Sequence, residues 1–112
     1  MKNTVLYTLF MILFSGSVLE AVEQPTFKTS IQPLVQKYCQ RCHNVDKMTS
    51  GIRVDQLDGS LEDRHLFLWK DILKQLDDEA MPPEDEPQPT VQERKQLVDW
   101  IKQTLITARS RN

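Results

Sequence analysis

Cys39-Gln40-Arg41-Cys42-His43 is the stretch of this 112-residue sequence on which the rest of the fold depends. C-x-x-C-H is the spacing at which haem is attached covalently, because two thiols three positions apart can form thioethers with both vinyl groups on one porphyrin edge. The imidazole that follows directly supplies a neutral nitrogen to the iron as the proximal ligand. The stretch therefore predicts one covalent haem c, attached through Cys39 and Cys42 and ligated by His43.

The same cysteine spacing also occurs in thiol redox centres and in one half of many zinc sites. The sequence contains two cysteines, both in the motif, so this chain alone cannot assemble a four-cysteine zinc or iron–sulfur centre. His65 is the single further histidine. A thioredoxin-like dithiol expects a βαβ context, whereas the flanks of the motif have helical patterns. We therefore favour haem, with a redox dithiol, a metal site and a chance match as the alternatives.

The start of the chain has the order of a secretory signal peptide. A lysine precedes the uncharged apolar run 5–14, and small residues follow it. We expect a signal peptide over residues 1–21, cleaved after Ser17 or Ala21. The apolar run is shorter than the roughly 20 residues that span a bilayer, so no firm membrane span is expected, with an uncleaved anchor as the alternative. Haem of this type is attached outside the cytoplasm, so we expect a periplasmic or otherwise exported protein.

Removal of the signal peptide leaves roughly 90 residues, which is one small domain. We expect a flexible leader over 22–29, a haem domain over 30–108 and a tail over 109–112. A core of this size stabilises a fold only marginally, and a covalent haem would act as a staple. With a formal net charge of -2 and no basic patch, the composition excludes a nucleic-acid-binding protein.

Apolar periodicity predicts about three helices. Ser30 can cap the first helix, with Pro33 in its first turn, and Asp63 can cap the second. A capping box, Thr90-Val91-Gln92-Glu93, starts the third, and Trp100 stands beside its apolar face, where it can cover the haem or the first helix. The apolar positions at helical spacing are Ile31, Leu34, Val35 and Tyr38, then Leu66, Trp69, Ile72, Leu73 and Leu76, then Leu97, Val98, Ile101 and Leu105. Residues 44–59 have no such period and predict a loop.

Met81 is the candidate for the sixth iron ligand. It stands in Ala80-Met81-Pro82-Pro83, where the paired prolines end any helix and present the thioether from a stiff loop. A thioether opposite a histidine stabilises ferrous iron and raises the reduction potential. The alternative for Met81 is a gap-filling core residue. Met48 follows His43 too closely to reach the opposite haem face, and His65 is either a solvated side chain or an alternative ligand.

Five parts of the chain carry a resemblance to a known family. They are residues 38–44, Ser50-Gly51-Ile52-Arg53-Val54-Asp55, Trp69, Glu79-Ala80-Met81-Pro82-Pro83 and Val98-Asp99-Trp100-Ile101. Together they resemble the planctomycete-type cytochrome c domain, a small monohaem cytochrome c of the class I kind, over roughly residues 31–105. The resemblance implies an all-α cytochrome c-like fold around one covalent haem, His43 and Met81 as axial ligands, and an envelope location. Such domains often form part of larger proteins, so we expect either a monomeric carrier or the haem subunit of a larger assembly.

The predicted function is electron transfer to redox protein partners of the cell envelope, without an enzymatic reaction. The porphyrin edge near Cys39 and Cys42 is the expected electron port. A haem that binds or senses a small diatomic ligand, with Met81 leaving the iron, is the alternative from another class. No group of nucleophile, base and orienting acid surrounds the cysteines in the sequence.

Two further features bear on that function. Arg53 and Trp69 can hydrogen-bond a haem propionate, since a buried carboxylate needs a partner, although core packing alone also explains Trp69. Six acidic residues flank Met81 in sequence and can steer a basic partner, or they merely keep the surface solvated. They are Asp77, Asp78, Glu79, Glu84, Asp85 and Glu86.

Overall fold

Residues 26–111, the part of the chain that the structure describes, fold into helices joined by loops in this computed structural model. In chain order they are the π-helical turn η1 (Phe27–Ile31), α1 (Gln32–Tyr38), the short 3-10 turn η2 (Thr49–Gly51), α2 (Asp63–Asp77) and α3 (Val91–Arg109). The described range contains no β-strand. The expectation of an all-α fold with three main helices is confirmed.

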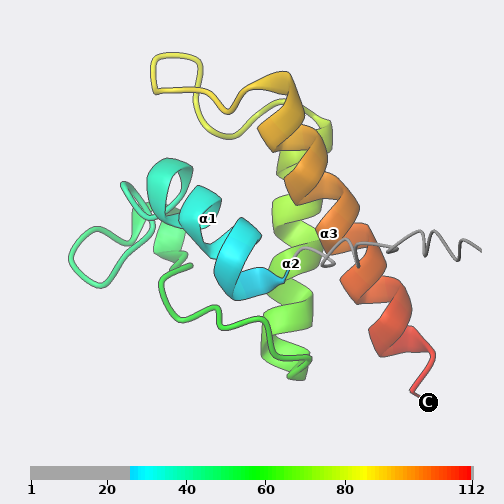
Figure 1. Cartoon of the computed structure of the whole chain (residues 1–112). Helices are drawn as coiled ribbons and strands as arrows, with labels where there is room; N and C mark the ends of the chain where they lie inside the picture. Colours follow the sequence, from blue (N-terminus) through cyan, green and yellow to red (C-terminus); the bar gives the residue numbers. More distant parts are fainter. Residues whose placement is uncertain (1–25, 112) are drawn as a thin grey trace, which may run out of the picture.

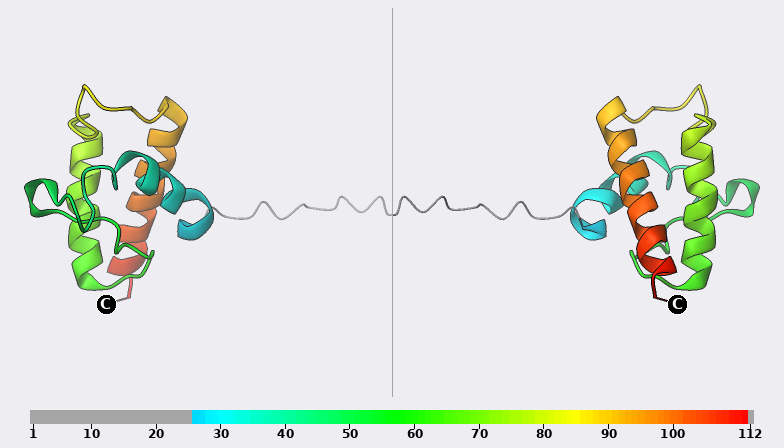
Figure 2. Two further views of the ribbon diagram at one scale, coloured as in Figure 1. Left: turned by 90° about the vertical axis from the view of Figure 1, so that its left-hand side faces the viewer. Right: turned by 90° about the vertical axis from the view of Figure 1, so that its right-hand side faces the viewer.

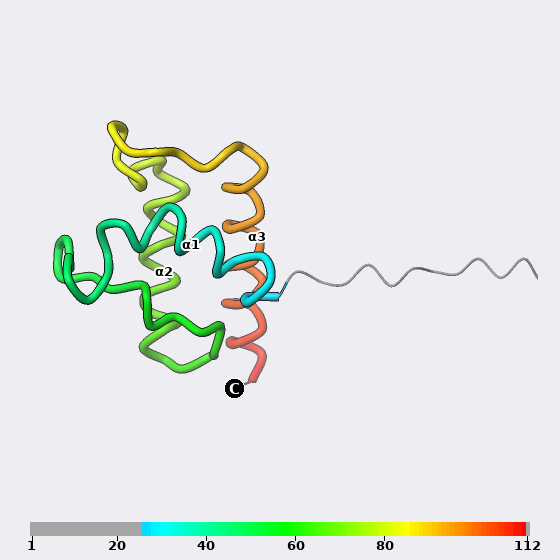
Figure 3. The backbone as a smooth tube through the Cα atoms, turned by 60° about the vertical axis from the view of Figure 1, so that its left-hand side comes forward, coloured from blue at the N-terminus to red at the C-terminus, as the bar shows by residue number. Residues whose placement is uncertain are grey.

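Helices α2 and α3 lie side by side and antiparallel, and α1 crosses this pair (Figure 1). Two side views show the same arrangement, with the connection between α2 and α3 running over one end of the pair (Figure 2). The long loop between α1 and α2 projects on the side away from α3 (Figure 3). The loop that follows the cysteine motif and the loop that carries Met81 therefore both border α2.

The first helical segment begins earlier than the sequence pattern predicts. Thr26 caps it, because its hydroxyl accepts a hydrogen bond from the Thr29 N–H at 3.2 Å. Phe27 is buried, and its ring centroid lies 6.1 Å from that of Trp69 and 5.6 Å from that of Trp100. The expectation of Ser30 as the cap is thus corrected, and the expected leader loses its last three residues to this helix. The reason is the aromatic cluster, which recruits Phe27 into the core.

The other two helix starts differ from each other. Glu62 is the N-cap of α2 without a side-chain cap bond, so the expectation that Asp63 caps this helix is wrong, and Asp63 is its first residue. The capping box of α3 is confirmed: the Glu93 N–H donates to the Thr90 hydroxyl at 3.0 Å, and the Thr90 N–H donates to the Glu93 carboxylate at 2.9 Å. The start of α3 is therefore firmly held.

The core follows the apolar positions that the periodicity predicts. Trp69 and Trp100 meet edge to face at its centre, with ring centroids 5.1 Å apart. Trp100 covers the first helical segment, which is one of the two roles expected of it. The predicted core positions that are buried are Ile31, Leu34, Val35, Tyr38, Trp69, Leu76, Leu97 and Ile101. The apolar faces of all three helices thus share one small core.

The predicted signal peptide, residues 1–21, lies outside the described residues, so its cleavage and the anchor alternative stay predictions. Among residues 26–111, no helix has the length and apolar character needed to cross a membrane.

Candidate functional site

A cavity of about 390 Å³ lies between the cysteine motif, α2 and the Met81 loop. This volume falls in the range of about 300–1,000 Å³ that is usual for small-molecule and cofactor sites. The side chains with haem-directed chemistry that line it are Cys39, Cys42, His43 and Met81. The apolar lining comprises Ile52, Val54, Leu68, Ile72, Leu76, Leu97 and four prolines at positions 82, 83, 87 and 89. Residues 42 positions apart in sequence, Cys39 and Met81, thus face one cavity.

The end of α1 positions the motif. Cys39 is the C-cap of this helix, and its N–H donates to the Val35 carbonyl at 2.9 Å. Its own carbonyl accepts from the Cys42 N–H at 3.3 Å and from the His43 N–H at 3.1 Å. These bonds close a tight turn, so both thiols and the imidazole reach the same cavity.

His43 is oriented by a backbone carbonyl. Its Nδ1 atom lies 3.2 Å from the carbonyl oxygen of Ile52. A carbonyl oxygen only accepts, so Nδ1 carries the hydrogen and Nε2 keeps its lone pair in the neutral ring. Such a bond fixes the ring and raises the basicity of a ligating imidazole. His43 is therefore prepared to bind a metal ion through Nε2.

The loop after His43 is fastened at both ends. The Thr49 N–H donates to the Cys42 carbonyl at 3.0 Å, and the Val54 N–H donates to the His43 carbonyl at 3.0 Å. Asn44 braces the base of the loop, since its carboxamide oxygen accepts from the N–H groups of residues 46 and 47 at 2.9 and 2.8 Å. Asn44 was not among the predicted site residues, although an asparagine at the start of a turn often accepts hydrogen bonds from the backbone N–H groups that follow it.

The Cys39 thiol lacks the lowered pKa of a redox-active cysteine. Both cysteines are free thiols, and burial raises the pKa of the Cys39 thiol to about 11. Reactive dithiols have a lowered pKa, because the thiolate is the nucleophile. The site thus favours a role of Cys39 as an attachment point over the redox-dithiol alternative.

Met81 is half-buried and lines the cavity. Its carbonyl accepts from the Arg94 guanidinium at 3.3 Å, and its N–H donates to the Gln75 carbonyl at 3.4 Å. Met48 is 53% exposed and does not line the cavity. The structure thus brings Met81 to the site and leaves Met48 outside it.

Arg53 and Trp69 do not line the cavity. The Arg53 guanidinium forms two hydrogen bonds with the Asp55 carboxylate, at 2.7 and 3.1 Å, and it lowers the pKa of that carboxyl. The Trp69 indole N–H has no hydrogen-bond partner in the described part of the chain, and protein atoms enclose it, so a ligand reaches it only if neighbouring atoms move. The propionate roles of both residues stay predictions, and their observed contacts supply other reasons for their positions.

His65 is neither solvated nor at the cavity, which corrects the expectation for this residue. It is 5% exposed at the start of α2, outside the cavity lining. Its Nδ1 lies 3.1 Å from the Ser60 hydroxyl and 3.3 Å from an Asp58 carboxylate oxygen. These partners belong to the turn before α2, so His65 joins that turn to the helix.

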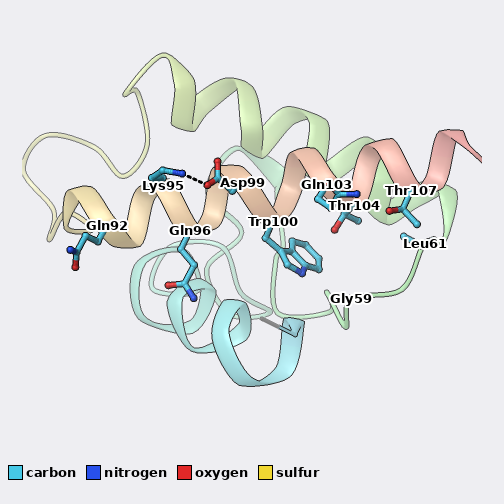
Figure 4. Close-up of a pocket in the computed structure, with 10 residues that line it drawn as sticks. All are labelled: Gly59, Leu61, Gln92, Lys95, Gln96, Asp99, Trp100, Gln103, Thr104 and Thr107. Atoms are coloured by element: carbon cyan, nitrogen blue, oxygen red, sulfur yellow. Dashed lines mark hydrogen bonds and ion pairs between the residues drawn. The ribbon is translucent and has the colours of Figure 1, made fainter. Parts of the chain in front are cut away.

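A second, more open hollow of about 790 Å³ runs along α3 (Figure 4). Its lining is mostly amide, hydroxyl and charged side chains, with Trp100 pointing from the helix toward η1. Lys95 and Asp99 pair within it. None of its lining residues is a cysteine, histidine or methionine, so it offers no thioether attachment and no usual haem ligand.

An all-α fold in which a C-x-x-C-H turn and a methionine face one largely apolar cavity is the arrangement expected of a small c-type cytochrome. Residues 39–85 match the protein family described as Planctomycete cytochrome C. The matched segment runs from the first cysteine past Met81, and it confirms the resemblance seen in the sequence. This match to a cytochrome c family indicates haem-based electron transfer in general terms and implies covalent haem c. No curated protein and no solved structure matches the chain.

Proposed function

We propose that this protein is an exported electron carrier with one haem c, attached through Cys39 and Cys42 and ligated by His43 and Met81. One observation carries the proposal: these four side chains line one cavity, and the Ile52 carbonyl holds the His43 ring with Nε2 free. Haem supplies, when bound, an iron that alternates between the ferric and ferrous states.

The residues of the chain have separate tasks in this proposal. Cys39 and Cys42 tether the group at the end of α1, and His43 gives a basic nitrogen of fixed orientation. Met81 offers a soft, neutral sulfur, which favours the reduced state and raises the potential. The apolar side chains that α2 contributes, Leu68, Ile72 and Leu76, would limit water beside the group, which also disfavours the more highly charged oxidised state. No residue is required to act as an acid, base or nucleophile, so we propose a carrier and not an enzyme.

The electron port in this proposal lies at the motif, where exposed residues surround the two half-buried cysteines. Arg41, between the cysteines, is exposed and pairs with Glu86 at 3.7 Å. Val45 and Met48 on the adjoining loop are 58% and 53% exposed. A redox protein of the cell envelope is the proposed partner, with this chain acting as a monomer or as a subunit.

The first test is an optical spectrum of the protein, produced by export in a host with haem-attachment machinery, in the oxidised and reduced states. We expect a c-type reduced spectrum, covalent haem by intact mass, and a weak far-red band of the oxidised form. Met81→Ala should abolish this band, because it removes the sulfur ligand. Met48→Ala is the matched control, since Met48 lies outside the cavity, and it should keep the band.

Three results would contradict parts of the proposal. Absence of covalent haem would return Cys39 and Cys42 to the dithiol or chance-match alternatives. A far-red band that survives in Met81→Ala would remove Met81 as the ligand. Prompt binding of carbon monoxide by the reduced wild-type protein would favour the small-ligand alternative, because it requires an open or easily vacated iron position.

A further inference from the structure

Arg94 has hydrogen-bond partners on both sides of the Met81 loop. Its guanidinium donates to the Leu76 carbonyl at 3.4 Å, to the Met81 carbonyl at 3.3 Å and to the Gln88 side-chain oxygen at 3.1 Å. It is the fourth residue of α3, near the positive end of the helix dipole, where a cation is unfavourable. The helix dipole therefore gives no reason for an arginine at position 94, whereas the hydrogen bonds of its guanidinium to the loop do.

Gln88 holds the rest of the same loop. Its side-chain N–H groups lie 3.0 Å from the Pro82 carbonyl, 2.8 Å from the Pro83 carbonyl and 3.0 Å from the Glu86 carbonyl. A proline-rich loop is poor in backbone donors, and apart from the Pro83 carbonyl, which also accepts from the Glu86 N–H at 2.9 Å, these carbonyls have side-chain partners. Together, the side chains of Gln88 and Arg94 lie within hydrogen-bond distance of the carbonyls of residues 81, 82, 83 and 86.

The neighbouring residue on α3 holds the opposite wall of the cavity. The Tyr38 hydroxyl donates to the Glu93 carboxylate at 2.7 Å. Tyr38 lines the cavity and directly precedes Cys39. Two consecutive residues of α3 thus contact the two segments that carry the cysteine motif and Met81.

We propose that Arg94 and Gln88 are positioning residues that set the distance between Met81 and the iron. The proposal rests on the proposed function, because it assumes Met81 as the sixth ligand. The first turn of α3 contacts both segments that carry the proposed ligands. Glu93 accepts the hydroxyl of Tyr38, which precedes the cysteine motif, and Arg94 donates to the Met81 carbonyl. Loss of the Arg94 contacts frees the loop and lets Met81 leave the iron more readily.

The test compares Arg94→Met, Gln88→Leu and Arg94→Lys with the wild-type haem protein. Lys95→Met is the matched control, because Lys95 is the next residue of α3 and its partner is Asp99 on the same helix. We expect carbon monoxide to bind the reduced Arg94→Met protein about tenfold faster, the factor that corresponds to one charge-assisted hydrogen bond. Gln88→Leu should show a smaller acceleration, Arg94→Lys an intermediate one, and Lys95→Met none.

A second readout separates positioning from a general effect on stability. In a denaturant titration, the far-red band of Arg94→Met should disappear before the helical far-ultraviolet signal, and hydrogen exchange at the amides of residues 80 and 81 should accelerate. If both signals vanish together and carbon monoxide binds at the wild-type rate, Arg94 is only structural and the proposal is overturned. If Arg94→Met does not fold, Gln88→Leu decides by the same criteria. A wild-type protein without the far-red band would refute Met81 ligation itself, which is a different failure.

Discussion

At the scale of single residues, the chemical role of a side chain depends on hydrogen-bond partners that the sequence patterns do not predict. His43 belongs to a motif that the sequence reveals. The sequence does not reveal the hydrogen bond between His43 Nδ1 and the Ile52 carbonyl, which leaves Nε2 as the free nitrogen. Arg53 pairs with Asp55, and its role at a haem propionate stays a prediction. His65 was expected to be either a solvated side chain or an alternative ligand, and it is buried against the turn before α2, outside the cavity lining. Asp55 and Ser60 lie only two and five positions from Arg53 and His65 in sequence, but this spacing alone does not show that they are the hydrogen-bond partners.

Gly59 gives a prediction at this scale. It has φ +85°, and a Cβ atom there would lie 2.7 Å from the Phe27 Cβ and 2.9 Å from the Phe27 Cγ. We expect Gly59→Ala to destabilise the fold by about 3 kcal/mol, since backbone strain adds to overpacking against a core ring. Chemical denaturation of the purified haem protein measures this change.

Gly51→Ala is the control for that substitution. Gly51 also has a positive φ, +74°, but no atom lies within 4 Å of its added Cβ. It should lose about 1 kcal/mol from backbone strain alone. Equal losses in the two variants would show that contact with Phe27 is not what makes Gly59 necessary.

At the scale of elements, the start of α3 holds most of the connections between separate parts of the site. Its capping box is a local pattern, and the sequence predicts it correctly. The same Glu93 carboxylate also accepts the Tyr38 hydroxyl from a position 55 residues away. The hydrogen bonds from Thr90 and then from Tyr38 lower the pKa of the Glu93 carboxyl. A cap thus also serves as a link between α1 and α3.

This lowered pKa makes the stability dependent on pH. A carboxyl whose pKa is lower in the folded state stabilises the fold at pH values above its unfolded pKa, about 4.3. The contribution is lost as the pH falls through the folded value. Glu93→Gln keeps an acceptor oxygen but removes the charge, so its thermal midpoint should lie below the wild-type value at pH 7 and approach it near pH 2.

The control for this experiment is Glu84→Gln, which neutralises an exposed carboxylate of the linker. It should leave the thermal midpoint close to the wild-type value at both pH values. A constant offset between Glu93→Gln and the wild type at all pH values would mean that the charge of Glu93 does not stabilise the fold.

At the scale of the whole molecule, the distribution of charge bears on partner choice. The segment around Met81 exposes Asp77, Asp78, Glu79, Glu84 and Asp85, whereas Glu86 is half-buried and pairs with Arg41. Asp78 pairs with Lys74 at 2.6 Å. Glu84 and Asp85 belong to the connection between α2 and α3, which runs over one end of this helix pair (Figure 2). Steering of a basic partner toward this end stays a proposal.

Small redox probes test the steering idea without a known partner. Glu84→Gln/Asp85→Asn should slow electron transfer to ruthenium(III) hexaammine several-fold at low salt and leave transfer to the anion ferricyanide no slower. The effect should vanish at 1 M salt, where the Debye length is about 3 Å. Glu62→Gln/Asp63→Asn, at the other end of α2, removes the same charge and serves as the control. Equal rates for both variants would leave solubility as the role of the acidic segment.

The sequence by itself determined the features that are encoded locally. The C-x-x-C-H motif, the helical period of the apolar residues, the capping box at Thr90 and the Met-Pro-Pro run all depend on neighbours within a few positions. These features were sufficient for the all-α fold and for the family resemblance, which residues 39–85 confirm.

Only the tertiary structure decided which distant residues act together. The contacts of Phe27 with the tryptophans, the Tyr38–Glu93 hydrogen bond and the hydrogen bond of Arg94 to the Met81 carbonyl each join residues well separated in sequence. Such contacts depend on how the helix faces pack against one another. A sequence pattern that predicts a helix does not specify which side chains of other helices it will contact. The shared cavity of His43 and Met81 therefore follows from the crossing of α1 over α2 and α3, which no local pattern specifies.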